Sequence, residues 1–423
     1  MVRRIVKIQF LGSTGEVGRS AIALKSEKTT LVLDYGVMLD SEPGFPMHIP
    51  PRDVDAAILT HAHLDHSGAL PIFHVTTQVP IYGNRLTFEL TELLITDFIK
   101  LSAYYLPYEF IDLQSMMSSC KPVEYKKPFK IKNVKITLLN AGHIPGSAQI
   151  LIEAEGKRLL YTGDINPIET RLLRGADTNY GELDAVIIES TYADQDHPNR
   201  KELEKKFVNA VREVVEQGGT VLVPAFSVGR AQEIILVLKA HNFEYDVVVD
   251  GMARMVNKIL LSHQKYLKDP KLFREAINEA IWINSKKDRR RVSREPCVIV
   301  SPAGMLKGGP AAYYIQRIAK NQENAIFLVS YQIPGTPGRE LLETGRCVID
   351  GKVQKVKARV EHFDFSSHAG ASDLHKIIKG LEGDPHIYVV HGAEGNCSRL
   401  AKWVREETGL KATAPRAGAI HKI

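Results

Sequence analysis

Short segments in which apolar and polar residues alternate recur along both ends of the chain, and this period of two predicts half-buried β-strands. Short apolar runs bounded by turn residues predict fully buried strands. Apolar residues at helical spacing predict helices over residues 86–99 and 394–407. The expected strands cover residues 5–10, 21–24, 30–36, 54–60, 79–83, 134–139, 148–154, 158–161, 184–192 and 387–392.

Strand and helix patterns alternate regularly through the middle of the chain. Expected helices at 199–217, 229–239, from 251 and at 307–320 are interleaved with expected strands at 220–223, 247–250, 298–301 and 325–330. This order predicts a parallel sheet with helices on both faces, a second α/β unit inserted in the first. A chain of 423 residues also exceeds one ordinary core. The expected domains are 1–194 and 363–423, which form one domain together, and the insertion 195–362.

Four metal-ligand side chains follow the expected strand 54–60 within six residues: His61, His63, Asp65 and His66. α/β proteins place their sites in such loops at the carboxyl ends of strands. Imidazole nitrogens suit zinc, and a carboxylate adds an oxygen ligand. His61 and His63 can reach one ion from the same side of an extended segment, whereas Asp65 and His66 lie past the bend and can serve a second ion.

Other strands also end in a polar residue of ligand type: Asp34, His143, Asp164, Glu189 and His391. Taken singly, each of them also fits a structural role, such as capping a turn. Together with the histidine-rich loop, they favour a metal centre.

The pattern His-x-His-x-Asp-His at 61–66 resembles the signature of the metallo-β-lactamase superfamily. This resemblance implies an α/β fold in which two packed sheets lie between helices, an αββα sandwich that carries one or two metals. It also implies that His143 is the third histidine and that Asp164 bridges the metals. Asp34 takes the position of the residue that orients the metal-binding loop.

Glu189, His368 and His391, with an α/β insertion after the first of them, resemble the β-CASP branch of this superfamily, which acts on nucleic acids. Residues 16–20, 335–339 and 366–369 are similar to archaeal homologues of the nuclease subunit of the cleavage and polyadenylation specificity factor, in a form without a KH-type region. The resemblance is likewise to a form without the C-terminal domain of bacterial J-type ribonucleases. The resemblance implies a zinc-dependent ribonuclease, an endonuclease or a 5′-to-3′ exonuclease or both, in RNA processing or decay.

The resemblance further implies two zinc ions per chain and a role for each site residue. One zinc would be held by His61, His63 and His143, the other by Asp65, His66 and His391, with Asp164 between them. Asp65 would orient the attacking hydroxide, and His368 would donate a proton to the leaving oxygen with Glu189 as its partner. Ser227, Arg230, Ser301 and Gly304 would approach RNA phosphates, although loop turns and helix caps explain them equally well.

The composition bears on the class of substrate and on the cellular compartment. The chain carries 55 Lys plus Arg against 49 Asp plus Glu, a net charge of +6 that is compatible with a polyanionic partner. RNA is the expected substrate, single-stranded DNA is an open alternative, and no apolar run is long enough for a membrane. Four widely spaced cysteines are typical of a reducing compartment, so the cytoplasm is expected.

Several points stay open at the level of sequence. The basic run 286–291 is expected to be a solvated loop. Residues 415–423 could pair with a second subunit in a homodimer or form the last strand of the core. Two other functions compete with the nuclease: a non-catalytic RNA-binding scaffold subunit, and another metallo-hydrolase on the same fold, such as a lactonase or thioesterase.

Overall fold

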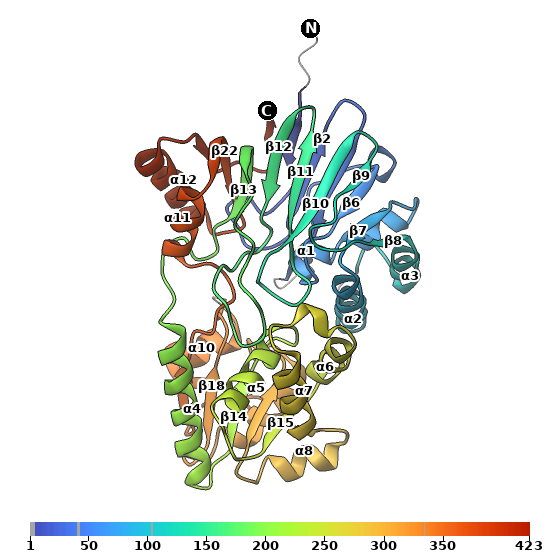
Figure 1. The fold of residues 1–423 in the computed structure, drawn as a ribbon. Helices are drawn as coiled ribbons and strands as arrows, with labels where there is room; N and C mark the ends of the chain where they lie inside the picture. The colour runs from blue at the N-terminus through green and yellow to red at the C-terminus, as the bar shows by residue number, and fades with distance from the viewer. Residues whose placement is uncertain (1–4, 40–42, 103–104, 334) are drawn as a thin grey trace. The chain divides into compact units, whose positions relative to one another are not determined.

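The structure, a computed structural model, describes residues 5–39, 43–102, 105–333 and 335–423 (Figure 1). Their contacts divide the chain into two compact units. The first unit comprises the described residues up to Glu169, then Gly175–Asp196 and Ser367–Ile423. The second unit comprises Thr170–Arg174 and His197–Ser366. The domain boundaries expected from the sequence stay a prediction.

The first unit contains two seven-stranded sheets. One has the order β24-β1-β2-β3-β6-β7-β8, with β1 at Lys7–Phe10, β2 at Ala21–Lys25, β3 at Thr30–Tyr35, β6 at Ala56–Ile58, β7 at Ile81–Gly83, β8 at Cys120–Pro122 and β24 at Ile420–Lys422. The other has the order β23-β22-β13-β12-β11-β10-β9, with β9 at Phe129–Ile131, β10 at Val134–Asn140, β11 at Ala148–Ala154, β12 at Lys157–Tyr161, β13 at Glu182–Glu189, β22 at Glu382–Val390 and β23 at Ala412–Thr413. A short pair, β4 (Met38–Leu39) and β5 (Pro43–Gly44), lies outside both sheets.

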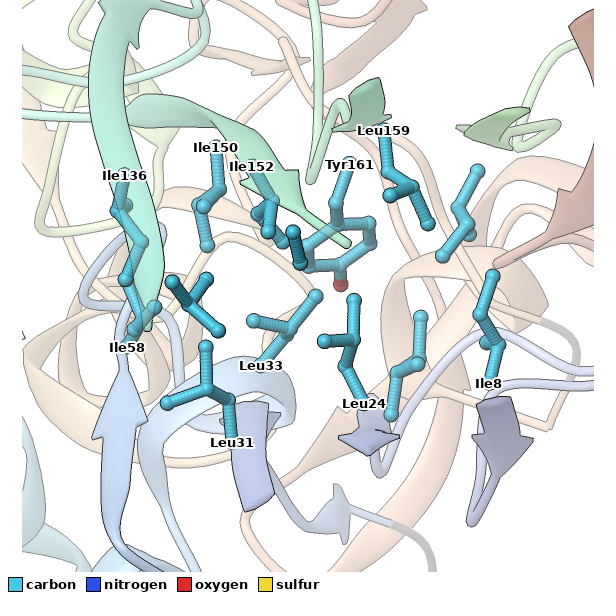
Figure 2. Packing of buried hydrophobic residues seen from close by; sticks show 14 of the residues in the cluster. Ile8, Leu24, Leu31, Leu33, Ile58, Ile136, Ile150, Ile152, Leu159 and Tyr161 are labelled. Atoms are coloured by element: carbon cyan, nitrogen blue, oxygen red, sulfur yellow. The ribbon is translucent and has the colours of Figure 1, made fainter. Parts of the chain in front are cut away.

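The two sheets pack face to face through an apolar core (Figure 2). The period of two in β10 sends Val134, Ile136 and Leu138 into this core, as the alternation predicts. Leu31 and Leu33 of β3 meet them from the other sheet. The sandwich is therefore specified by side chains that alternate along each strand.

Helices cover the outer face of each sheet. A second apolar cluster joins the first sheet to α2 (Arg85–Leu101), α3 (Phe110–Ser119) and the short 3-10 turn at Leu70–His74. A third joins the other sheet to α11 (Ala371–Lys379) and α12 (Glu394–Thr408). The first unit is thus an αββα sandwich, as expected. Two further short elements are α1 (Leu64–Ser67) and a 3-10 turn at Pro51–Asp53.

The second unit is built on one parallel sheet of six strands. The order is β16-β15-β17-β14-β18-β21, with β14 at Val221–Pro224, β15 at Val247–Val249, β16 at Ile281–Trp282, β17 at Val298–Ser301, β18 at Ala325–Leu328 and β21 at Arg359–His362. Every residue of β14, β17 and β18 is buried, as in sheets covered on both faces.

The covering elements of the second unit are seven helices and a hairpin within its described residues. They are α4 (Arg200–Glu216), α5 (Arg230–Ala240), α6 (Met252–Ser262), α7 (Pro270–Glu279), α8 (Lys286–Val292), α9 (Gly309–Ile318), α10 (Pro337–Thr344), and β19 (Arg346–Ile349) with β20 (Lys352–Lys355). A 3-10 turn lies at Gln264–Tyr266. The inserted α/β unit is confirmed as an element of the fold.

Three details differ from the sequence-based expectation. The basic run 286–291 is not a loop but forms most of α8, because Ser285 and Asp288 cap its first turn reciprocally. The strand expected at 54–60 shortens to β6, and the strand expected to reach residue 192 ends at Glu189.

The tail forms β24, which pairs with β1 in antiparallel fashion, so it is the last strand of the core. No helix in the described part of the chain combines the length and apolar character that crossing a membrane requires.

Candidate metal centre

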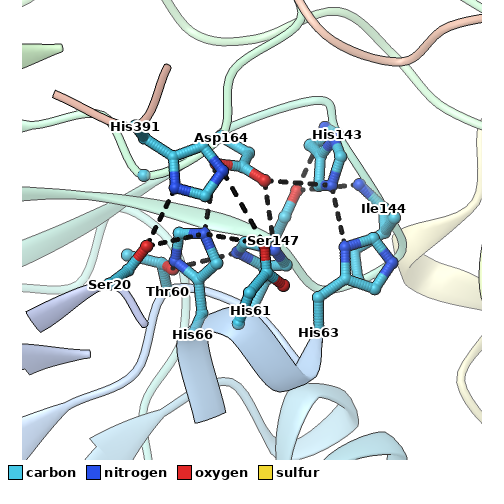
Figure 3. A network of polar contacts seen from close by, with 12 residues as sticks. Ser20, Thr60, His61, His63, His66, His143, Ile144, Ser147, Asp164 and His391 are labelled. Atoms are coloured by element: carbon cyan, nitrogen blue, oxygen red, sulfur yellow. Dashed lines mark hydrogen bonds and ion pairs between the residues drawn. The ribbon is translucent and has the colours of Figure 1, made fainter. Parts of the chain in front are cut away.

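Strand ends and short loops bring the predicted ligands to one place in the first unit (Figure 3). The segment after β6 carries His61 and His63 and continues into α1, whose single turn carries Asp65 and His66. His143, Asp164 and His391 follow β10, β12 and β22, respectively. Because the two sheets face each other, strand ends from both sheets meet at this edge.

One cluster consists of His61, His63, His143 and Asp164. His63 Nδ1 lies 3.1 Å from His143 Nε2. Asp164 Oδ2 lies 3.5 Å from Nε2 of both His61 and His143. All four ligand atoms lie within 4.8 Å of one another, a spacing that a single cation can bridge.

A second cluster consists of Asp65, His66, Asp164 and His391. Asp164 Oδ1 lies 3.2 Å from His66 Nε2 and 3.5 Å from His391 Nε2. Asp65 Oδ2 completes the group, 3.7 Å from His391 Nε2. Asp164 therefore directs one carboxylate oxygen to each cluster, and both clusters share it.

The donor set fits cations. His61 Nε2, Asp164 Oδ1 and His391 Nε2 are buried, and no hydrogen bond satisfies them within the described structure. Buried polar atoms rarely stay unsatisfied, and coordination of a cation would satisfy these three. Burial lowers the pKa of His61 and His143 well below the usual value, so both imidazoles are held in the neutral form that binds metals.

Asp34, at the end of β3, holds the histidine-rich loop in place. Its carboxylate accepts hydrogen bonds from the Thr60 N–H at 2.7 Å and the Thr60 hydroxyl at 2.8 Å. The carboxylate also lies 2.7 Å from His66 Nδ1 and accepts a hydrogen bond from the Tyr161 hydroxyl at 2.9 Å. His66 Nε2 is thereby turned toward Asp164. The positive φ of Asp34, +55°, marks a backbone conformation that costs energy and is concentrated at functional sites.

Three supporting contacts were missed by sequence reasoning. Ser13 and Ser20 each place a hydroxyl 2.9 Å from Nδ1 of His391, and the Ser367 carbonyl lies 2.9 Å from His143 Nδ1. Such contacts fix which ring nitrogen points to a metal. The sequence signals here were weak: Ser13 lies in a glycine-rich segment, residues 11–18, and Ser20 lies in the segment 16–20 that carries part of the family resemblance.

A third group lies beside the two clusters. His368 Nδ1 lies 3.0 and 3.1 Å from the two carboxylate oxygens of Glu189, which is 1% exposed. Burial opposes the charge on His368, but the Glu189 carboxylate outweighs it and raises the pKa of the imidazole to about 9. The His368 ring packs 4.5 Å from that of His143, measured between centroids. The pair is therefore an imidazole whose raised pKa favours its protonated form, held by a glutamate side chain next to the candidate metal ligands.

The four predicted phosphate-binding residues all belong to the second unit, at or beyond the ends of β14 and β17. Ser301 is fully buried, and Arg230 is 8% exposed at the start of α5. Gly304 lies against the backbone of Phe226, where an added Cβ would be 3.0 Å from its nitrogen. Their role in RNA binding, like the individual roles of the ligands, stays a prediction.

Known families match the chain along most of its length. The metallo-beta-lactamase superfamily model matches residues 14–225, the Beta-Casp domain residues 231–341, and the Zn-dependent metallo-hydrolase RNA specificity domain residues 353–415. A crystal structure of a protein of unknown function from Enterococcus faecalis V583 has the same fold, with a TM-score of 0.63 at 13% identity, covering 99% of this chain and 100% of that one.

Three curated relatives come from archaea. RNase aCSPSF2 of Saccharolobus solfataricus is 43% identical over 97% of this chain and 84% of its own length. Probable RNase MJ4 of Methanocaldococcus jannaschii is 37% identical over 98% of this chain and 99% of its own. Transcription termination factor FttA of the same organism is 36% identical over 95% of this chain and 69% of its own. With these matches and the shared carboxylate between two histidine clusters, the chain belongs to the β-CASP branch of the metallo-beta-lactamase superfamily.

Proposed function

We propose that the chain is a metal-dependent ribonuclease that hydrolyses phosphodiester bonds of RNA with two zinc ions bound per chain. The observation that carries this proposal is the position of Asp164 between two clusters of ligand atoms, each compact enough for one cation. Two cations that share a carboxylate suit the in-line displacement at a phosphate. The names of the relatives, RNase aCSPSF2 and Probable RNase MJ4, support RNA as the substrate.

One ion would be held by His61, His63 and His143 and the other by Asp65, His66 and His391, with Asp164 common to both. Bound zinc supplies charge stabilisation for the phosphate and lowers the pKa of a water molecule to about 7. Asp65, whose side chain is 26% exposed, accepts a hydrogen bond from the attacking water and aligns it.

His368 donates a proton to the leaving sugar oxygen. The hydrogen bond from its Nδ1 to Glu189 supports this role, because it leaves Nε2 as the donating nitrogen and keeps the ring protonated at neutral pH. Glu189 itself is fixed by the Ile165 N–H at 2.8 Å. The arrangement matches that of catalytic imidazoles oriented by a buried carboxylate.

Digestion of RNAs labelled at either end tests the function and its mode. Internal fragments indicate an endonuclease, and a ladder from the 5′ end indicates a 5′ exonuclease. Zinc analysis of protein purified without chelator is expected to approach two ions per chain. Folded protein without zinc, or hydrolysis of small esters but not RNA, would contradict the proposal.

Three further features of the proposal rest on the sequence. Single-stranded DNA is a second substrate to be assayed in parallel, and sedimentation of the purified chain tests a homodimer. A cytoplasmic location is supported by four cysteines that are all free thiols. Fractionation of cells that express the protein tests the location.

A further inference from the structure

Helix α8, labelled in the second unit in Figure 1, carries basic residues at positions that place them along one side of the helix. At 100° per residue, the five basic residues fall within an arc of about 140°. All five side chains are exposed. They are Lys286, Lys287, Arg290 and Arg291 of the helix, and Arg294 in the turn that follows. We call these five residues the α8 basic surface.

The opposite side of α8 fixes the helix to the sheet. Arg289 points inward and forms a bidentate ion pair with Asp250, with nitrogen–oxygen distances of 2.6 and 3.1 Å. Asp250 is fully buried at the end of β15 and also accepts a hydrogen bond from the Tyr314 hydroxyl at 2.8 Å. Val292 is buried as well. The α8 basic surface is therefore held in one orientation rather than carried on a flexible loop.

Only part of this charge helps the helix to fold: Arg290 and Arg291 lie in the last turn, where the helix dipole favours positive charge. Lys286 and Lys287 occupy the first turn, where the helix dipole disfavours positive charge. Lys286 and Arg290, and likewise Lys287 and Arg291, are like charges four residues apart, which destabilises a helix. The two lysines of the first turn therefore have no explanation in the local stability of α8.

Acidic side chains neutralise little of the surface. Arg291 pairs with Glu295 at 3.2 Å. For the other four cations, the described residues provide no ion pair. The only apolar side chain of α8 is buried, so the exposed side lacks the apolar centre typical of a protein–protein interface. A flexible polyanion fits such a surface better than a folded protein does.

We propose that the α8 basic surface, which belongs to the second unit, binds phosphates of an RNA strand. The inference rests on the proposed ribonuclease function. Lysine and arginine contacts to phosphates carry no sequence information, so the surface would raise affinity for RNA whatever its sequence, and more for long strands, which offer it more phosphates. It would therefore lower KM for long substrates without changing kcat.

The test removes four of the charges: Lys286→Ala, Lys287→Ala, Arg290→Ala and Arg291→Ala in one protein. For a single strand, every phosphate that a cation no longer neutralises reduces the slope of log K against log salt by about 0.7. We expect the slope for a long unstructured RNA to fall by about 2 to 3 and its affinity at low salt to fall on the order of tenfold or more. Zinc content and cleavage of a very short RNA are expected to stay at the parent level.

A matched control removes four exposed lysines of the first unit, which lie on and around β8 and β9: Lys121, Lys127, Lys130 and Lys132, each changed to Ala. The decrease in net charge is the same, so an equal decrease in affinity in the control would overturn the proposal. Parent-like salt dependence of the α8 variant would overturn it as well. If the parent neither binds nor cleaves RNA, both the proposed function and this inference fail. If the parent cleaves RNA, the proposed function holds and the α8 variant tests the inference alone.

Discussion

At the scale of single residues, the roles of His368 and of the metal ligands make different predictions. His368→Ala is expected to slow RNA cleavage by about 10²- to 10⁴-fold, the usual contribution of a positioned acid. Zinc content and RNA affinity should stay unchanged, because His368 is assigned to proton transfer. Glu189→Gln should have a similar effect, and the double variant should be little worse than either, since the two residues act as a unit.

The matched comparison is His391→Ala. Nε2 of His391 faces Asp65 and Asp164, so removal of the imidazole should weaken or abolish binding of the second zinc. Single-turnover cleavage and metal analysis of all four proteins separate the two roles. Cleavage at the parent rate by His368→Ala, or loss of zinc from it, would show that its role is misassigned.

Asp34 makes a second prediction at this scale. It contacts Thr60, His66 and Tyr161 but is not a member of either ligand cluster. Asp34→Ala should weaken zinc binding by about 10- to 100-fold, the usual effect of losing a residue that orients a ligand. Competition with a chelator measures this. Tyr161→Phe is the control, because it removes one hydrogen bond and keeps the carboxylate; an equal effect of both changes would contradict the assignment.

The clustering of the candidate ligands could be predicted from sequence because four of them lie within six residues and the others follow strands. The residues that hold these side chains in place could not be predicted. Ser13 and His391 are 378 residues apart, and Ser20 and His391 are 371 apart, so only the pairing of distant strands brings them together. The positive φ of His391, +49°, is likewise imposed by the folded surroundings and has no signature in the sequence.

At the scale of elements, helices and strands with a clear hydrophobic period were predicted from the sequence. Elements that depend on contacts with distant residues were not. β10 and α2 show their periods in the sequence and lie within two residues of the expected bounds at each end. α8 has a single apolar residue, Val292, so its period is invisible. Contacts from Arg289 to Asp250, 39 residues away, and the capping residues make it a helix. β16, with two residues, is too short for any pattern to show.

Glu204 on α4 makes a prediction about how elements of the second unit are joined. Arg171 donates to it at 2.6 Å, and His241 at the end of α5 lies 3.0 Å from it. Burial alone would raise the pKa of Glu204, but the hydrogen bonds from Arg171 and His241 lower it below its ordinary value of 4.5. The lowered pKa means that the carboxylate stabilises the fold fully above about pH 4.5, and that this contribution is lost as the pH falls through the folded-state pKa.

Glu204→Gln should therefore reduce the free energy of unfolding at pH 7 by about 2 kcal/mol, the value of charge-assisted hydrogen bonds. The difference from the parent should shrink as the pH is lowered below 4. Denaturant unfolding of both proteins, with zinc chelated throughout, measures it. Glu202→Gln, an exposed change on the same helix, should have an effect below about 0.5 kcal/mol. A difference for Glu204→Gln that is constant with pH would contradict the pKa argument.

At the scale of the whole molecule, all the candidate catalytic and metal-binding groups belong to one of the two units. Both ligand clusters and the Glu189–His368 pair lie in the first unit, although His368 and His391 follow the insertion in sequence. The sequence predicted this split because the pattern changes from mainly strands to alternating strand and helix near residue 199. It did not predict that Thr170–Arg174, far from the insertion boundary, belongs to the second unit. That segment is tied there by Glu204 and Glu233, which are themselves 33 and 62 residues further along.

This division predicts how the molecule responds to removal of metal. A bound cation would link loops that follow β6, β10, β12 and β22, and so would join the two sheets of the first unit. A ligand at 1,000 times its dissociation constant stabilises the folded state that binds it by about 4 kcal/mol. Chelation should therefore lower hydrogen-exchange protection in peptides covering 58–66 and 387–392, while peptides covering 221–224 and 298–301 in the second unit keep theirs. His391→Ala should show part of the same decrease before chelator is added. An equal decrease in protection in both units, or none in either, would show that the cations do not act as a link within the first unit.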